Sequence, residues 1–293
     1  MSIQSNITRT IYASALQGTM VLGIPYDIPA NTTLNEKFNI HPDAVVPVDE
    51  YPTVKYMGIG RGGHRAITGS DNSALTGLNV HRASDAALFT HIPYILRTLD
   101  DDLAVSERAK YGLRTIETHN GIDYIAYYLR RMNHNELAPQ LQRVTVTDGE
   151  TTSLPYVPSS TDLNPTPMIV APVEVNSSNG EYLTASVLIQ FELTTNDIAE
   201  IKAACVIIYG DALYATLSEL CLCSGFDKVV TTADLDGNDF NYTEAIGVQM
   251  NTAICTHYNL TAINSGLVLT YNLGASESLA IAGANGTTET TVI

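Results

Sequence analysis

The chain has 293 residues, 45% of them hydrophobic, and a formal net charge of −16. This length allows one large domain or two ordinary ones with hydrophobic cores, while the acidic balance disfavours binding to nucleic acid phosphates and anionic membranes. No stretch approaches the roughly 20 apolar residues of a membrane-spanning helix, and no secretion signal is evident, so we expect a soluble protein made in the cytoplasm.

The charge is divided unevenly along the chain. Residues 1–143 hold 13 Lys/Arg and 14 Asp/Glu, a net charge of −1, whereas residues 144–293 hold 2 Lys and 17 Asp/Glu, a net charge of −15. This split predicts two regions with different surroundings, the second suited to basic surfaces, divalent cations or solvent. The cysteines form no CxxC pair and are predicted to be reduced thiols. They are Cys205, Cys221, Cys223 and Cys255.

Residues 1–82 are predicted to be an extended arm with loops. Five prolines between positions 25 and 52 disfavour helices there, and residues 11–24 are apolar enough to add one strand or helix to a core. Residues 58–63 match G-x-G-x-x-G, but residues 64–72 resemble a loop rather than the helix of a dinucleotide site. We therefore predict a basic loop that contacts a partner, such as the acidic half of another copy. Its candidate residues are Arg61, His64, Arg65 and Arg82.

Residues 83–143 are predicted to be a helical segment. Ser84 is a suitable cap for a helix that starts at Asp85 and is bent or interrupted by Pro93. A last helix is indicated by apolar residues spaced three, four and three apart. These are Ile122, Ile125, Leu129 and Met132.

Residues 144–293 are predicted to form an acidic α+β domain. Leu183 to Leu193 alternate with a period of two, which predicts a half-buried strand. A helix follows with an apolar face at Ile198, Ile201, Cys205 and Ile208, capped by Asn196 or Thr195. After Gly210 the helical pattern continues and is predicted to stop at Gly225. Further strands are expected at 143–147, 168–175, 246–258 and 267–273, with turns at 148–149 and 179–180.

The predicted fold class is therefore α+β. It comprises an antiparallel β-sheet or sandwich with a helical hairpin packed on it, plus a mainly helical N-terminal half.

No catalytic or cofactor motif is present, so we predict a non-enzymatic protein without a cofactor. The one oxygen-rich loop, residues 234–239, has its glycine at the fourth position rather than the sixth of a calcium loop. Asp234, Asp236 and Asn238 are therefore only weak metal candidates. An enzyme would instead need a pocket that gathers several basic side chains of the first half. These are Arg61, His64, Arg65 and His119.

Four short stretches resemble virion structural proteins of tailed bacteriophages. They are residues 207–211, 222–227, 242–246 and 265–274, so the likeness lies within 183–275 and includes no functional motif. The resemblance implies a subunit of a homo-oligomeric ring in the neck or connector between head and tail. Its partners would be copies of itself and other virion proteins, with assembly in the host cytoplasm and final location in the virion. DNA would pass through such a ring without specific binding, and no membrane is involved.

Two alternatives remain open. The first is a baseplate or tail-associated structural protein, and the second is a surface binding or decoration module.

Overall fold

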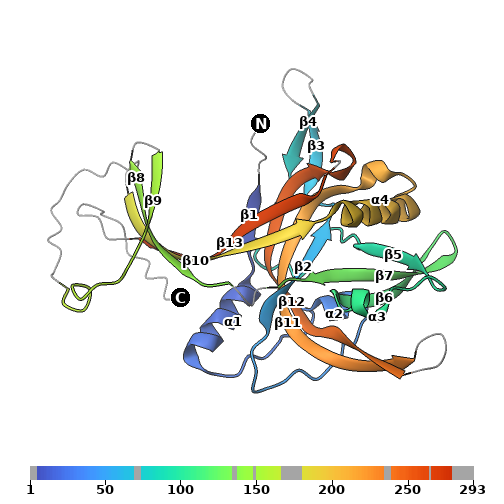
Figure 1. Ribbon diagram of the computed structural model, residues 1–293, viewed down its shortest axis with the longest axis horizontal. Coiled ribbons are helices and arrows are strands. Elements are labelled where there is room, and N and C mark those ends of the chain that lie inside the picture. The colour runs from blue at the N-terminus through green and yellow to red at the C-terminus, as the bar shows by residue number, and fades with distance from the viewer. Residues whose placement is uncertain are drawn as a thin grey trace. The chain divides into compact units, whose positions relative to one another are not determined.

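The computed structural model describes residues 5–68, 74–133, 137–147, 150–165, 180–233, 239–263 and 265–278. Within these ranges the fold is mainly antiparallel β, with four α-helices (Figure 1). The predicted helical N-terminal half is therefore wrong, and so is the α+β class. The chain forms two compact units, one from residues 1–133 and 193–267 and the other from residues 134–192 and 268–292.

The first unit is built on a seven-stranded sheet in the order β1-β12-β11-β2-β7-β5, with β6 also paired to β7. Its centre is the long pair β11 and β12, which pair antiparallel along most of their length. A separate ribbon is formed by β3 and β4. The strands are β1 (Asn6–Arg9), β2 (Thr53–Gly60), β3 (His64–Thr68), β4 (Ala74–Leu78), β5 (Ile95–Thr98), β6 (Tyr111–His119), β7 (Ile122–Arg131), β11 (Thr216–Ala233) and β12 (Asp239–Asn259).

Two longer helices and two short ones accompany this sheet. The longer helices are α1 (Ile11–Leu22) and α4 (Thr195–Tyr209), and the short ones are α2 (Leu34–Phe38) and α3 (Val105–Arg108). The strand or helix expected within residues 11–24 is helix α1, and α4 confirms the helix predicted after residue 195. No helix in the described part of the chain is long and apolar enough to cross a membrane.

The helix predicted at residues 122–132 is strand β7. Its five residues from Ile125 to Leu129 are all buried, so the strand is covered on both faces and its apolar run has no period of two. Its tyrosines and isoleucines suit a strand. A tight turn at Asn120 and Gly121, with φ angles of 52° and 78°, joins β7 to β6. Asn-Gly is a strong hairpin signal, and it outweighs the helical spacing that follows it.

Helix α4 begins one or two residues earlier than the two predicted caps, Thr195 and Asn196, would place it. Its cap is Thr194, whose hydroxyl accepts a hydrogen bond from the backbone N–H of Asp197 while the Asp197 carboxylate accepts from the Thr194 N–H. Thr195 and Asn196 are therefore not the cap. The helix ends at Gly210, which has a φ of 84°.

The helical continuation predicted beyond Gly210 is wrong. A short 3₁₀ turn at Ala212–Tyr214 is followed at once by β11. Residues 215–226 are continuously buried, which explains why they show no strand alternation. Gly225 lies inside β11 and is not a helix stop.

Two further expectations in the first half need correction. Residues 64–68 of the predicted loop form β3. No helix begins at Asp85; its carboxylate instead accepts a hydrogen bond from the backbone N–H of Arg82 and closes a turn.

The second unit contains a four-stranded antiparallel sheet in the order β13-β10-β8-β9. Its strands are β8 (Gln140–Thr147), β9 (Glu150–Pro155), β10 (Gly180–Leu193) and β13 (Leu267–Ser278). The strands predicted at 143–147, 183–193 and 267–273 are confirmed, as is the strand at 246–258, which belongs to β12 of the first unit. The predicted strand at 168–175 and the turn residues 148, 149 and 179 lie outside the described residues.

Candidate functional site

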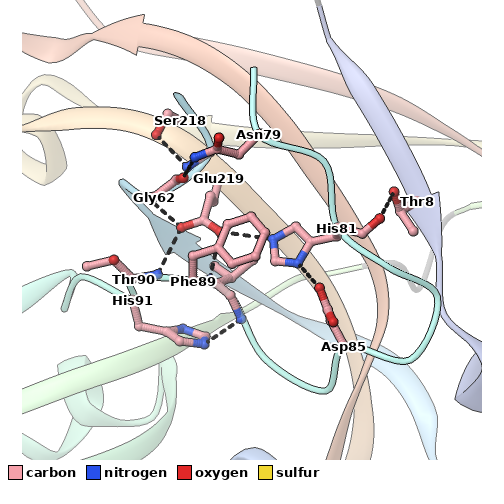
Figure 2. A network of polar contacts seen from close by, with 12 residues as sticks. Thr8, Gly62, Asn79, His81, Asp85, Phe89, Thr90, His91, Ser218 and Glu219 are labelled. Carbon is pink, nitrogen blue, oxygen red and sulfur yellow. Dashed lines mark hydrogen bonds and ion pairs between the residues drawn. The ribbon is translucent and has the colours of Figure 1, made fainter. Parts of the chain in front are cut away.

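An extended polar cluster surrounds Glu219, a buried carboxylate on strand β11 of the first unit (Figure 2). Three backbone N–H groups donate to it. The N–H of Gly62 lies 2.7 Å from Oε2, that of Thr90 3.1 Å from the same oxygen, and that of Phe89 2.8 Å from Oε1. We call Glu219 and these three N–H groups the Glu219 cradle. It attaches two irregular segments, near residues 62 and 89, to strand β11.

His81 places its imidazole between two carboxylates, as Figure 2 shows. Its Nε2 lies 2.9 Å from Oε1 of Glu219, and its Nδ1 lies 3.0 Å from Oδ2 of Asp85. Burial alone would lower the pKa of His81, but the hydrogen bonds to Glu219 and Asp85 outweigh burial and raise that pKa. The ring also stacks on Phe89, with ring centroids 3.9 Å apart. The cluster therefore favours an imidazolium that neutralises the buried Glu219 charge.

The glycines of the G-x-G-x-x-G stretch allow the backbone to approach this cluster closely. A Cβ at Gly60 would lie 2.5 Å from the carbonyl oxygen of Thr90, and a Cβ at Gly63 would lie 2.0 Å from that of Ser218. The stretch is followed by strand β3 and not by a helix. Its backbone N–H at Gly62 does bind an anion, but that anion is the protein's own Glu219.

Ser218 and His64 form a second polar contact, on the other side of this stretch. The Ser218 Oγ lies 2.8 Å from Nδ1 of His64 and accepts a hydrogen bond from the Gly63 N–H at 3.1 Å. Burial, followed by the nearby charges of His257 and Arg61, lowers the pKa of His64. A serine nucleophile needs an accessible hydroxyl and an oriented base. Ser218 is buried, and no carboxylate among the described residues hydrogen-bonds to His64.

The four predicted partner-contacting residues differ in their surroundings. Arg61 stacks on two rings, with its guanidinium carbon 4.3 Å from the centroid of Tyr209 and 4.7 Å from that of Tyr214. His64 is held by Ser218 as described above. Arg65 and Arg82 are exposed. Arg61 and His64 therefore contact other residues of the same chain, whereas the side chains of Arg65 and Arg82 are exposed to solvent. Contact of these residues with a partner stays a prediction.

An open hollow of about 590 Å³ lies beside the Glu219 cradle. Arg65 is the one charged residue among those that line it. An enzyme site was expected to gather several of Arg61, His64, Arg65 and His119, and of these four residues Arg65 alone lines the hollow. Its lining is Gly62, Arg65, Leu78, Asn79, Val80, Phe89 and Thr90.

The described residues contain no group of three or more His, Cys, Asp or Glu side chains that could hold a metal ion. The weak metal candidates Asp234, Asp236 and Asn238 lie outside the described residues. All four cysteines are buried free thiols, and the Sγ atoms of Cys221 and Cys223 lie 3.5 Å apart. Burial raises the pKa of Cys223.

The residues of the Glu219 cradle and its partner His81 were not predicted from the sequence. One signal was available, because Glu219 is the only charged residue between Ala212 and Phe226. A lone carboxylate in an apolar run that forms a buried strand must find compensating donors elsewhere in the chain. The identity of those donors is not visible in the sequence, because they are backbone groups and a distant histidine.

Fold and site together define a mainly β protein of two units, in which the central polar cluster holds irregular segments on a buried strand. The chain belongs to DUF7208, a family of unknown function, which it matches over residues 1–288. No curated protein and no solved structure matches the chain.

Proposed function

We propose that the protein is a non-enzymatic structural subunit of a tailed-phage particle. It assembles with copies of itself into a ring in the neck between head and tail, and it contacts other virion proteins there. Assembly takes place in the host cytoplasm, and the product remains in the virion. The local resemblance of residues 183–275 to phage structural proteins supports the phage setting. The neck position rests on that resemblance alone.

The buried polar cluster supports a structural role over a catalytic one. Glu219 and His81 are both buried, and their hydrogen-bonding atoms are engaged by backbone N–H groups and by each other. A general acid or base must reach a proton of its substrate. The acid–base groups of this cluster therefore serve to fix loops.

The observation that carries self-assembly is a face of the sheet of the second unit on which exposed leucines surround an arginine, Arg143, that is ion-paired with Glu181. In the strand register, Leu183 of β10 lies opposite Arg143 of β8, and Arg143 lies opposite Leu154 of β9. Residues directly opposite one another lie on the same face. Leu141 and Ala185 form the next pair on that face. We call these five residues the β8–β10 face.

In the described part of the chain, the β8–β10 face is largely open to solvent. Leu154 is 62% exposed and Leu141 is 43% exposed. Ala185 is exposed as well, and Leu183 is half-buried. Exposed leucines beside an edge strand, here β9, form a surface that proteins normally cover. A second copy of the chain would cover it and pair with that edge.

Light scattering on the eluting protein, followed by negative-stain imaging of the same fraction, tests this proposal. We expect a closed ring of defined mass. The double variant Leu141→Asp with Leu154→Asp places two charges on the β8–β10 face and should shift the mass toward that of the monomer.

The matched control is Thr151→Asp, at an exposed position on β9, the strand that also carries Leu154. Thr151 lies opposite Val146, in the alternate register, so its side chain is on the other face. It should assemble as the unchanged protein does. A wild-type monomer at every concentration, or equal assembly of the double variant, would contradict the proposal.

A further inference from the structure

The hollow beside the Glu219 cradle combines a cation with exposed apolar surface. Arg65 is exposed at this hollow, while Val80 and Phe89 remain 58% and 48% exposed. Leu78 contributes a further apolar side chain. A lining of one guanidinium and several apolar groups suits a ligand that carries a carboxylate on an apolar body.

A single positive charge, that of Arg65, lines the hollow. The Glu219 carboxylate behind the lining is buried and accepts hydrogen bonds from three backbone N–H groups, and His81 lies between Glu219 and Asp85. Residues 61–82 hold three arginines and one acidic residue, Asp71. Arg61 is stacked on Tyr209 and Tyr214, so Arg65 is the cation that this hollow presents.

The walls of the hollow are also fixed in place before any ligand arrives. The N–H groups of Gly62, Phe89 and Thr90 are bound to Glu219. The Asn79 side chain donates a hydrogen bond of 2.7 Å to the carbonyl oxygen of Gly62. A preorganised surface loses less conformational entropy on binding than a mobile one.

We infer that this hollow receives an acidic segment from residues 144–293 of a second copy of the chain. The charge division favours that occupant, since those residues carry a net charge of −15 and the first half carries −1. A polyanion such as nucleic acid suits the hollow less well, because the chain as a whole carries −16 and the hollow offers one arginine. This inference rests on the proposed self-assembly and names a second contact between copies, in addition to that at the β8–β10 face.

Photo-crosslinking between differently labelled copies tests the contact directly. A photo-crosslinking amino acid in place of Val80 sits at the exposed lining of the hollow. Unlabelled protein carrying it is mixed with ¹⁵N-labelled wild-type protein, assembled and irradiated. Mass spectrometry should find the crosslink in a labelled peptide from residues 144–293. Crosslinks confined to the same copy, to residues 1–143 of the other copy, or to co-purified nucleic acid overturn the inference.

A charge reversal separates this contact from assembly in general. Arg65→Glu should weaken association about tenfold or more, because it opposes like charges across the contact. Lys37→Glu changes the net charge equally at another exposed position, in α2, and should leave association within about twofold.

The outcomes distinguish the two proposals. If the wild type assembles and Arg65→Glu assembles equally well, the hollow is not the contact, while the proposed ring stands. If the wild type is a monomer at every concentration, both proposals fail. Loss of assembly in the Leu141→Asp and Leu154→Asp variant, with Arg65→Glu unaffected, would leave the β8–β10 face as the interface and exclude the hollow.

Discussion

Glu219 and His81 form an ion pair in which neither side chain reaches solvent, with Oε1 and Nε2 2.9 Å apart. The pair joins β11 to a segment more than 130 residues earlier in the chain. A buried charge pair costs desolvation, and the loss of one partner leaves the other charge uncompensated. The stability of the first unit should therefore depend on this pair more than on any exposed ion pair.

Glu219→Gln should lower the free energy of unfolding by about 3 kcal/mol, because it leaves His81 without its main counter-charge and turns an NH₂ group toward backbone donors. Urea unfolding measures this loss. Glu50→Gln is the matched control at an exposed position and should change stability by no more than about 0.5 kcal/mol. Equal free energies of unfolding for the two variants would show that the Glu219 cradle does not stabilise the fold.

The raised pKa of His81 predicts a dependence of stability on pH. The folded state holds its proton more tightly than the unfolded state, whose pKa is about 6.5. The stabilisation is therefore complete below about pH 6.5 and is lost as pH rises through the folded pKa, by at most about 1.4 kcal/mol per pH unit. His81→Gln removes the titrating group. The difference in unfolding free energy between wild type and variant should shrink as pH rises. A difference that stays constant with pH would contradict a protonated His81 in the folded state.

Gly63→Ala should destabilise the protein by about 3 kcal/mol, since its Cβ would meet the Ser218 carbonyl oxygen at 2.0 Å and backbone atoms would have to move. Gly18→Ala, within helix α1, is the matched control. A Cβ there meets nothing within 4 Å, and alanine favours a helix by roughly 0.5–1 kcal/mol over glycine. Thermal unfolding should thus move in opposite directions for the two variants. A Gly63→Ala protein as stable as wild type would show that the close approach is not required.

Thr194→Ala should cost about 1 kcal/mol of stability, because it removes the side-chain cap of helix α4. Thr195→Ala changes the same residue type one position later, inside the helix, and should have little effect. Chemical unfolding of both variants distinguishes the two candidate caps. A larger loss at Thr195 than at Thr194 would reverse the assignment.

Sequence alone predicted the strands whose residues alternate between apolar and polar. At residues 183–193 and 267–273, in β10 and β13, the alternation reflects burial that is mainly on one face. At residues 246–258 of β12 it appears although residues 244–251 are all buried, because the polar side chains Gln249 and Asn251 form hydrogen bonds inside the protein. Strands β7 and β11 were mistaken for helices, since both have stretches that are buried on both faces and contain apolar residues at nearly every position. In such strands, chance spacings of three and four imitate a helix.

The site was harder to predict than the strands. The sequence analysis singled out the glycine-rich stretch and its basic residues, and the structure places that stretch beside the central polar cluster. Its binding partner, however, is Glu219, which lies 157 residues from Gly62 in the chain. The donors from Phe89 and Thr90 are backbone N–H groups. Every residue except proline has such a group, so the residue type does not indicate that it binds Glu219.

The order of strands in the first unit has a consequence for how the protein is made. Strand β2 pairs with residues 219–225 of β11, and β1 pairs with residues 252–255 of β12. The N-terminal strand therefore leaves the ribosome roughly 10 to 50 s before its partner has been synthesised, at about 5–20 residues per second. During that interval the early strands of the first unit have exposed edges, so we expect folding of this unit to finish only after most of the chain has been translated.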